Sequence, residues 1–438
     1  MQSAIGHFRT PLYLNAYALM ISNILSSGLG VVYWSLAAHL YRVEDVGVSA
    51  AVISTVMFLT GISQLNLRMA LLRLVPSAGE RTPRLIWLAY ALTLAITFVV
   101  ALVVFSGMAI SGSSTLALAG LPTIGGVLFL TLGTMASSIF NLQDGVLAGL
   151  RRTVWVPVEN GFYSAAKIVL LLVFAVTLPA LGIVVSWFVP MFALVAVVTA
   201  VLAWRWIPAH VAARSGRGPQ LRGRRLLNFV AADYVGAMFT LAVQSLLPVL
   251  ILLYLGARNG AYFAIVWTIA TSLNLLPINL CASLTVETVH SGGDLATEVR
   301  KAGIHMALLL LPLVAVIVIF AEWILHIFGP DYSAAGTVAL RLLALAVIPV
   351  AVNTLFMATS RIRGRAREIL VVQAVLAILT LAGSAVLIGP LGINGVPLAW
   401  LASQTLVAIV LGIGFLRPMI SRASAGGVAG GPAPEPAS

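Results

Sequence analysis

The sequence predicts an all-α membrane protein of about twelve transmembrane helices. Three observations support this prediction: 61% of the 438 residues are hydrophobic, only 9% are charged, and the mean hydropathy is +1.06. A soluble domain of this composition would have too few polar side chains to cover its surface, so a bilayer is the expected surrounding. One helical crossing takes ~20 apolar residues, and twelve crossings joined by short loops use most of the chain.

Six apolar segments fill the first half, each bounded by charged residues or by Gly/Pro-rich turns. The first is too long for a cleaved signal peptide, and no convincing small-residue cleavage motif precedes the second. It is therefore expected to be the first helix. The six segments are 14–41, 46–72, 85–109, 121–149, 154–178 and 181–204.

Six further segments follow the longest polar interruption, and arginines or short turns again separate them. They are approximately 226–256, 260–289, 302–328, 333–360, 368–388 and 391–416. We therefore expect an N-terminal lobe at 1–207, a basic cytoplasmic linker at 208–225, a C-terminal lobe at 226–417 and a disordered cytoplasmic tail at 418–438.

The basic residues predict the orientation. With a cytoplasmic N-terminus, twenty of the 25 lysines and arginines fall in inner loops and tails, two in outer loops and three inside spans. This asymmetry follows the positive-inside rule and predicts that both termini are cytoplasmic in a cell membrane. The net charge of +12 is then explained by topology and by contact with anionic lipids, without nucleic acid as a partner.

The two halves resemble repeats of each other. The segment Leu181-Gly182-Ile183 recurs as Leu391-Gly392-Ile393, 210 residues later, and other short matches keep nearly the same offset. Because each half has an even number of spans, the halves would be related by a pseudo-twofold axis along the membrane normal. A substrate cavity between two six-helix lobes is the expected consequence.

Several segments together resemble a known family. They are Pro11-Leu12-Tyr13, Trp34, Val46-Gly47, the run from Leu71 to Pro76, and the junction LAGLRRTVWVPVEN that contains Arg151. These segments and the six-plus-six layout resemble the oligosaccharide flippase (O-antigen-type) branch of the multidrug/oligosaccharidyl-lipid/polysaccharide (MOP) exporter superfamily. The fourteen spans typical of the lipid II flippases in that superfamily do not fit here.

The resemblance implies a V-shaped, MATE-like pair of lobes that works by alternating access. Its expected substrate is a polyprenyl-diphosphate-linked oligosaccharide, carried from the inner to the outer leaflet for cell-surface polysaccharide biosynthesis. A polysaccharide polymerase and glycosyltransferases would then be partners. The resemblance implies no cofactor.

Three cations lie inside the predicted spans, where a charge is costly unless it is paired or hydrated. Lys167 lies fifteen residues after Arg152, or ~22 Å along a helix, and Arg341 lies ~15 Å from the outer end of its span. Either could bind a diphosphate in the cavity or pair with a neighbouring helix. Arg68 is close enough to the cytoplasmic end of its helix to extend its head group toward water.

Three acids, Asp144, Glu159 and Asp233, are expected ~10 to 12 Å from the inner surface. They could couple transport to a cation or form structural ion pairs, and Arg68 is the expected partner of Asp144. Polar amides lie among the spans and could contact sugar hydroxyls or bond neighbouring helices. They are Asn141, Gln143, Asn160, Asn274 and Asn353.

Enzymatic motifs are not found in the sequence. It contains no Walker A loop, dinucleotide fingerprint or HExxH motif, its histidines lack metal-ligand spacing, and the single Cys281 allows no cysteine metal site. The expectation is therefore a transporter without a catalytic or metal site. An integral membrane glycosyltransferase or polymerase is one alternative, and a MATE-like multidrug or cation exporter is the other.

Overall fold

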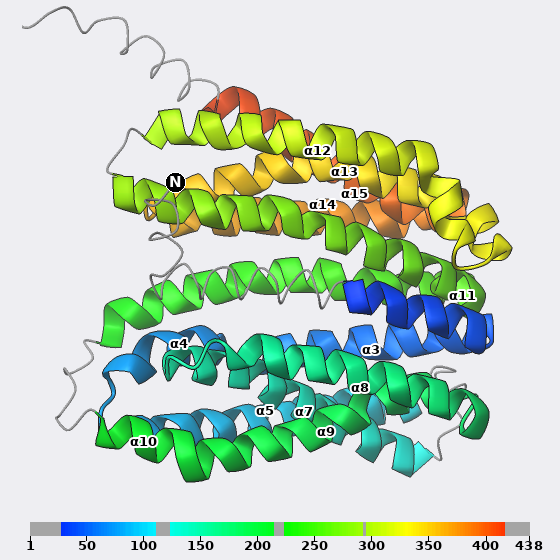
Figure 1. The fold of residues 1–438 in the computed structure, drawn as a ribbon. Helices are drawn as coiled ribbons and strands as arrows, with labels where there is room; N and C mark the ends of the chain where they lie inside the picture. Colours follow the sequence, from blue (N-terminus) through cyan, green and yellow to red (C-terminus); the bar gives the residue numbers. More distant parts are fainter. Residues whose placement is uncertain (1–27, 111–122, 214–222, 292–294, 417–438) are drawn as a thin grey trace, which may run out of the picture. The chain divides into compact units, whose positions relative to one another are not determined.

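The computed structural model describes residues 28–110, 123–213, 223–291 and 295–416, in which helices are the only regular elements (Figure 1). Nine helical stretches in these ranges are long and apolar enough to cross a membrane, and a shorter apolar helix covers Gly28–Leu40. Two of the nine, Tyr234–Cys281 and Ala366–Gly414, are each long enough for two crossings. The chain breaks inside them at Gly256 and Gly392, both with positive φ. The predicted all-α membrane class is confirmed.

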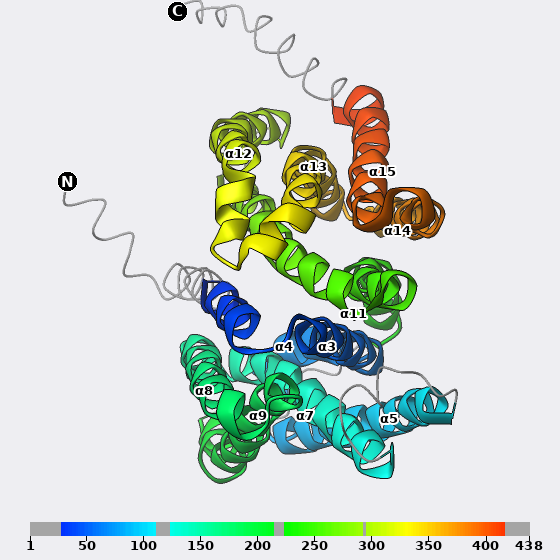
Figure 2. The ribbon, with the colours of Figure 1, turned by 90° about the vertical axis from the view of Figure 1, so that its right-hand side faces the viewer.

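The first of two compact units contains the chain up to Thr268 together with His326–Ala335. α7 is its central helix, because it packs against α3, α4, α5 and α9, while α8 packs mainly against α9 (Figure 2). The helices of this unit after Gly28–Leu40 are α3 (Val43–Ser63), α4 (Leu67–Leu74), α5 (Thr82–Ile110), α7 (Thr123–Gly149), α8 (Trp155–Thr177), α9 (Gly182–Val201) and α10 (Ile207–Ala212).

The second compact unit contains Ile269–Leu325 and Gly336–Ser438. Its largest helix pairing is between α14 and α15, and α11 contributes to both units. The helices concerned are α11 (Gly223–Ser291), α12 (Leu295–His326), α13 (Pro330–Ile362), α14 (Ala366–Leu391) and α15 (Gly395–Leu411). The predicted lobe boundaries stay a prediction, because these units follow packing density and not the sequence repeat.

The predicted second span, 46–72, is not one continuous helix. It is divided into α3 and α4 at Gln64–Asn66, where Leu65 and Asn66 have φ of 46° and 57°. Asparagine tolerates this left-handed conformation, whereas leucine rarely adopts it. The Gln64 side chain donates a hydrogen bond to the Ser138 carbonyl of α7 at 3.0 Å, which ties the break to the central helix.

The last helices of the two halves repeat each other. α9 begins at Gly182, and the corresponding helical segment begins at Gly392, 210 residues later. Each runs into a π-helical turn, at Leu202–Trp206 and Gly412–Leu416, again 210 residues apart. A π turn is rare, so its recurrence at the same offset supports the predicted internal repeat.

A hydrogen bond donated by a buried side-chain amide also recurs at this offset. Gln143 on α7 donates to Thr199 Oγ1 on α9 at 3.0 Å, and Asn353 on α13 donates to Gln404 Oε1 on α15 at 2.7 Å. Residues 143 and 353 are 210 apart. Each half therefore joins its fourth and sixth predicted spans by an amide hydrogen bond inside the apolar core, where losing the partner would cost free energy.

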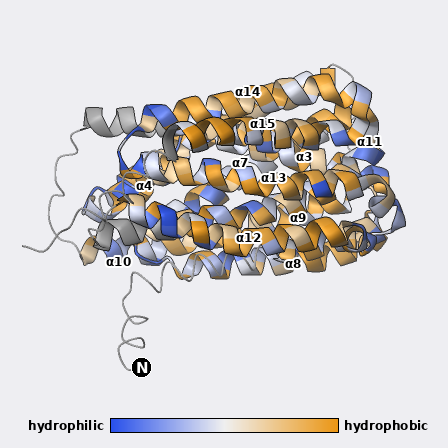
Figure 3. Ribbon diagram, turned by 90° about the horizontal axis from the view of Figure 1, so that it is seen from above, coloured by the Kyte–Doolittle hydropathy of each residue, from blue (hydrophilic) through white to orange (hydrophobic). Residues whose placement is uncertain are grey.

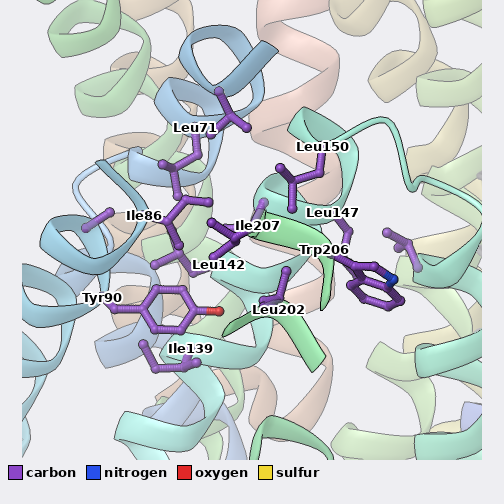
Figure 4. Close-up of a cluster of buried hydrophobic side chains, with 14 residues drawn as sticks. Leu71, Ile86, Tyr90, Ile139, Leu142, Leu147, Leu150, Leu202, Trp206 and Ile207 are labelled. Atoms are coloured by element: carbon purple, nitrogen blue, oxygen red, sulfur yellow. The ribbon is translucent and has the colours of Figure 1, made fainter. Parts of the chain in front are cut away.

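One end of the first unit contains a cluster of buried apolar side chains (Figure 4). The cluster joins Leu71 of α4, Leu150 after α7 and Trp206 after α9. Each lies within two residues of an arginine: Arg73, Arg151 and Arg205. The arginine-bearing junctions of this unit therefore meet at the same end, as the predicted topology requires.

Large apolar side chains cover the outside of the helices. Trp204 is 84% exposed, Trp323 76% and Leu308 67%. Along the individual helices, hydrophobic residues occupy the middle and hydrophilic residues gather toward the ends (Figure 3). These exposed side chains are suited to contact with lipid, and the tryptophans to the bilayer interface.

Candidate functional site

The buried face of α8 carries two of the predicted site residues. Val156, Glu159, Tyr163, Lys167 and Leu171 are all buried and follow one another at intervals of three or four residues. This spacing places them on one side of an α-helix, which faces the interior of the first unit. Glu159 and Lys167 are eight residues apart, so ~12 Å of helix separates the acid from the cation.

Lys167 is enclosed by aromatic rings. Its side chain is only 5% exposed, and its Nζ lies 4.1 Å from the ring centroid of Trp187, 5.0 Å from Tyr33 and 5.1 Å from Tyr163. These distances are typical of cation–π contacts. We call Lys167, Tyr33, Tyr163 and Trp187 the lysine cage.

Hydrogen bonds hold two of the cage rings in place. Tyr33 donates from its hydroxyl to the Ile183 carbonyl at 2.9 Å and lies 2.9 Å from Ser186 Oγ. Tyr163 donates to the Trp187 carbonyl at 3.1 Å. The Tyr33 and Tyr163 hydroxyls therefore bond α9, and their ring faces are left to the ammonium.

Lys167 has no hydrogen-bonded or carboxylate partner among the residues that the structure describes. The rings attract its charge but offer no oxygen to its three N–H donors. A buried ammonium without such an acceptor is costly, so an anionic or polar group that reached it would be bound strongly.

The predicted pair of Arg68 and Asp144 is present. Arg68 Nη2 lies 3.6 Å from Asp144 Oδ2, with side-chain exposures of 46% and 15%. The distance is that of an ion pair without a short hydrogen bond. Asp144 Oδ1 is buried and has no hydrogen-bond partner in the described part of the chain.

Glu159 is the least satisfied acid in this region. It is 5% exposed, and neither carboxyl oxygen has a hydrogen-bond partner among the described residues. Asp144 is near enough to interact with it electrostatically. Buried acids need compensating positive charge, which Arg68 supplies to Asp144 and which a proton or a monovalent cation would supply to Glu159.

Arg341 belongs to the second compact unit. It is half-buried, and its Nε donates a hydrogen bond to the Val318 carbonyl of α12 at 3.0 Å. One nitrogen of the guanidinium is therefore held by the neighbouring helix. Asp233 lies on α11, but its side chain is outside the part that the structure describes.

The polar amides divide into three groups. Asn141 and Asn160 donate to carbonyls one turn earlier in their own helices. Gln143 and Asn353 join neighbouring helices, as described above. Asn274 is half-buried, and its Oδ1, like Asn353 Oδ1, has no hydrogen-bond partner among the described residues.

The ring residues of the lysine cage were not among the sequence candidates. Tyr163 lies one turn before Lys167, so the spacing alone would have indicated its contact. Tyr33 and Trp187 come from other helices and carry no such signal. Among the described residues, no group of three His, Cys, Asp or Glu side chains is placed to hold a metal ion.

No model of a known protein family matches the sequence, and no curated protein matches it significantly. Solved structures match nearly the whole chain. One is an inward-facing multidrug resistance MATE family transporter of the MOP superfamily, with 17% identity, a TM-score of 0.67, and coverage of 94% of this chain and 96% of that one. Another is the MATE multidrug transporter DinF-BH in complex with R6G, with 13% identity, a TM-score of 0.65, and coverage of 94% and 97%.

A third is a MATE in complex with MaL6, with 15% identity, a TM-score of 0.62, and coverage of 94% and 97%. At these identities the likeness is one of fold. The fold expected from the sequence resemblance, that of MOP-superfamily transporters, is therefore confirmed.

Proposed function

We propose that this chain is a multi-pass transporter that moves its substrate by alternating access. The likeness of its fold to MATE transporters supports export over catalysis, so a glycosyltransferase or polymerase is the weaker alternative. Its ionisable residues within spans, together with lipid-facing apolar surfaces, support a pathway for a charged amphiphile. The proposed location is the cell membrane, with both termini in the cytoplasm.

The proposed substrate is a polyprenyl-diphosphate-linked oligosaccharide, carried from the inner to the outer leaflet. The observation that carries this proposal is Lys167, a cation buried at mid-span without a carboxylate partner among the described residues. A cationic drug would be repelled by such a group, whereas a diphosphate would supply the missing acceptors. Arg341 adds a second cation in the other unit.

In this proposal the lysine cage holds the ammonium until the substrate arrives. Cation–π contacts of ~0.5 to 2 kcal/mol each can retain the charge in a dry interior, but charge-assisted hydrogen bonds to phosphate are stronger. The lysine would therefore exchange rings for phosphate oxygens as the pathway opens. Flipping would supply glycan to a polysaccharide polymerase on the outer side, after glycosyltransferases complete it inside.

The proposal is tested by neutralising the two cations in the full-length protein. Reconstituted Lys167→Met and Arg341→Gln should each lower the flipping rate of a fluorescent polyprenyl-diphosphate oligosaccharide by about tenfold, or ~1.4 kcal/mol. Lys167→Arg and Arg341→Lys keep the charge and should retain part of the rate. Thermal unfolding of Lys167→Met should stay within ~1 kcal/mol of wild type, because removing an unpaired buried charge offsets the lost ring contacts.

Flipping at the wild-type rate by both neutral variants would contradict the substrate proposal. A lower unfolding temperature of Lys167→Met with normal flipping would assign Lys167 a structural role only. Neither outcome would change the assignment of the fold, which rests on the helices and on the likeness to MATE transporters.

A second candidate function is export of drugs or other organic cations. Glu159 and Asp144 favour it, because buried acids within spans are suited to bind a cation or to couple export to protons. The same vesicles should then accumulate ethidium, and Glu159→Gln should abolish that accumulation. Flipping of the glycan without ethidium transport would exclude this candidate, while the opposite result would replace the first proposal.

A further inference from the structure

The junction between α13 and α14 carries a groove that the proposed transport pathway does not use. Its volume is about 680 Å³, and it lies within the second compact unit. Phe356, Val371, Val372 and Leu411 form its apolar wall, while Arg365 and Arg367 form its polar rim. The apolar wall continues into the buried cluster that Phe356 and Val372 share with α15.

Positive charge dominates the rim. Arg365 and Arg367 line it with one acid, Glu368, and two further arginines, at positions 361 and 363, precede it in the same junction. Glu368 is already bonded by Arg365 Nη1 at 2.9 Å and by Ser360 Oγ at 3.0 Å. Arg367 has neither an ion-pair nor a hydrogen-bond partner among the described residues. The rim therefore has unneutralised charge to offer to an anion.

The N-terminus of α14 adds to the positive electrostatic potential at the rim. Arg365 is its N-cap residue and makes no side-chain cap hydrogen bond. The first N–H groups of a helix are partially positive and favour phosphate. An apolar wall beside a cationic rim is complementary to a molecule with a phosphate at one end and hydrocarbon at the other.

We propose that this groove binds an anionic glycerophospholipid of the inner leaflet, with its phosphate at Arg367 and its acyl chains along Phe356, Val372 and Leu411. The junction follows the tenth predicted span, so the orientation proposed above puts it at the depth of the cytoplasmic head groups. Lipids are the anionic amphiphiles most concentrated there. This inference concerns a face distinct from the lysine cage and is independent of the transported substrate.

The first half provides a matched control. At its corresponding junction, Arg151 and Arg152 are exposed, and Trp155 packs on Trp206 with ring centroids 5.3 Å apart. Both junctions carry arginines, but in the first half the pair of tryptophan rings stands beside them. Arg152→Ala therefore removes one inner-surface charge outside the groove.

The test measures binding of fluorescent phosphatidylglycerol to the purified full-length protein in detergent. Arg367→Ala should weaken binding about fivefold, the effect of one arginine at an anionic surface. Arg152→Ala should leave it unchanged. Val371 is 53% exposed, so Val371→Trp should fill the groove without disturbing the core and should weaken binding with all arginines kept. Phosphatidylcholine should bind weakly.

Equal losses in Arg367→Ala and Arg152→Ala would overturn the proposal, because they would show diffuse surface attraction. Unchanged binding in both Arg367→Ala and Val371→Trp would also overturn it. Glycerol 3-phosphate has the head-group phosphate but no chains, so it should fail to displace the lipid. Efficient displacement would mean that the site takes a soluble phosphate and not a lipid.

Discussion

Lys167 shows how a membrane protein can store a charge at mid-depth. Three rings surround its ammonium at 4.1 to 5.1 Å, and none of them is an anion. The attraction of the rings therefore lowers the cost of burial without neutralising the charge. A site arranged in this way remains able to bind an anion, whereas a lysine paired with a carboxylate would first have to break that pair.

Arg68 and Asp144 allow the value of an ion pair to be measured. Asp144→Asn and Arg68→Gln should each destabilise the protein by about 1 kcal/mol, a modest cost because Arg68 is 46% exposed. The double variant should be more stable than the sum of the single effects predicts, since no unpaired charge is left. Thermal unfolding of the four purified proteins gives the coupling energy, and additive effects would show that the two charges do not interact.

The depth of the charges could be predicted from the sequence, but most of their surroundings could not. Counting residues from Arg152 placed Lys167 at mid-span, and comparing helix depths paired Arg68 with Asp144. The rings of Tyr33 and Trp187 reach Lys167 only through the packing of separate helices, which no local spacing encodes. Gln143 and Asn353 were recognised as polar residues in spans, but the structure was needed to show that they bond neighbouring helices.

At the scale of the element, the break after α3 and two glycines of α7 position Arg68. A Cβ added to Gly145 would lie 2.6 Å from the Arg68 carbonyl oxygen, and one added to Gly149 would lie 2.9 Å from the Leu71 carbonyl oxygen. These glycines are four residues apart on one face of α7, the arrangement that lets two helices approach closely in a membrane. The short α4 therefore packs against α7 through its backbone.

Gly145→Ala should separate α4 from α7 and destabilise the protein by ~1 to 3 kcal/mol, the usual cost of overpacking. The pairing of Arg68 with Asp144 should weaken with it, so the coupling energy of the charge pair should fall in the Gly145→Ala background. Gly107→Ala is the matched control, because nothing lies within 4 Å of a Cβ added there. It should be neutral or stabilising, since alanine is the better helix former. An equal loss in both variants would contradict the close-packing explanation.

Most helix boundaries could be predicted because charges and turn residues mark them. The segments expected at 85–109 and 154–178 are observed as Thr82–Ile110 and Trp155–Thr177. The break at Gln64–Asn66 could not be predicted, because no proline marks it and the nearest glycine, Gly61, lies inside α3. Only the tertiary bond from Gln64 to α7 and the close approach of α4 account for it.

At the scale of the whole molecule, the uneven distribution of arginines between the two ends of the helices relates the fold to the bilayer. In the first unit the junctions near Arg73, Arg151 and Arg205 meet around one apolar cluster. Helix packing alone requires no such gathering of arginines, whereas insertion into a membrane does. The same rule predicts that the α13–α14 junction, with its four arginines, lies on the cytoplasmic side.

The orientation can be tested with single cysteines at opposite ends of the first unit. Glu80 precedes α5 and Ala180 precedes α9; both side chains are exposed, and the native Cys281 is buried and can be replaced by serine. A membrane-impermeant maleimide added to intact cells should label Ala180→Cys but should label Glu80→Cys only after permeabilisation, because the arginine-rich junctions are expected inside. Ser215→Cys in the linker, which lies outside the described residues, should behave like Glu80→Cys. The reverse pattern would invert the topology and move the lipid groove to the outer face. Labelling of all three from outside would contradict the odd number of crossings between positions 80 and 180.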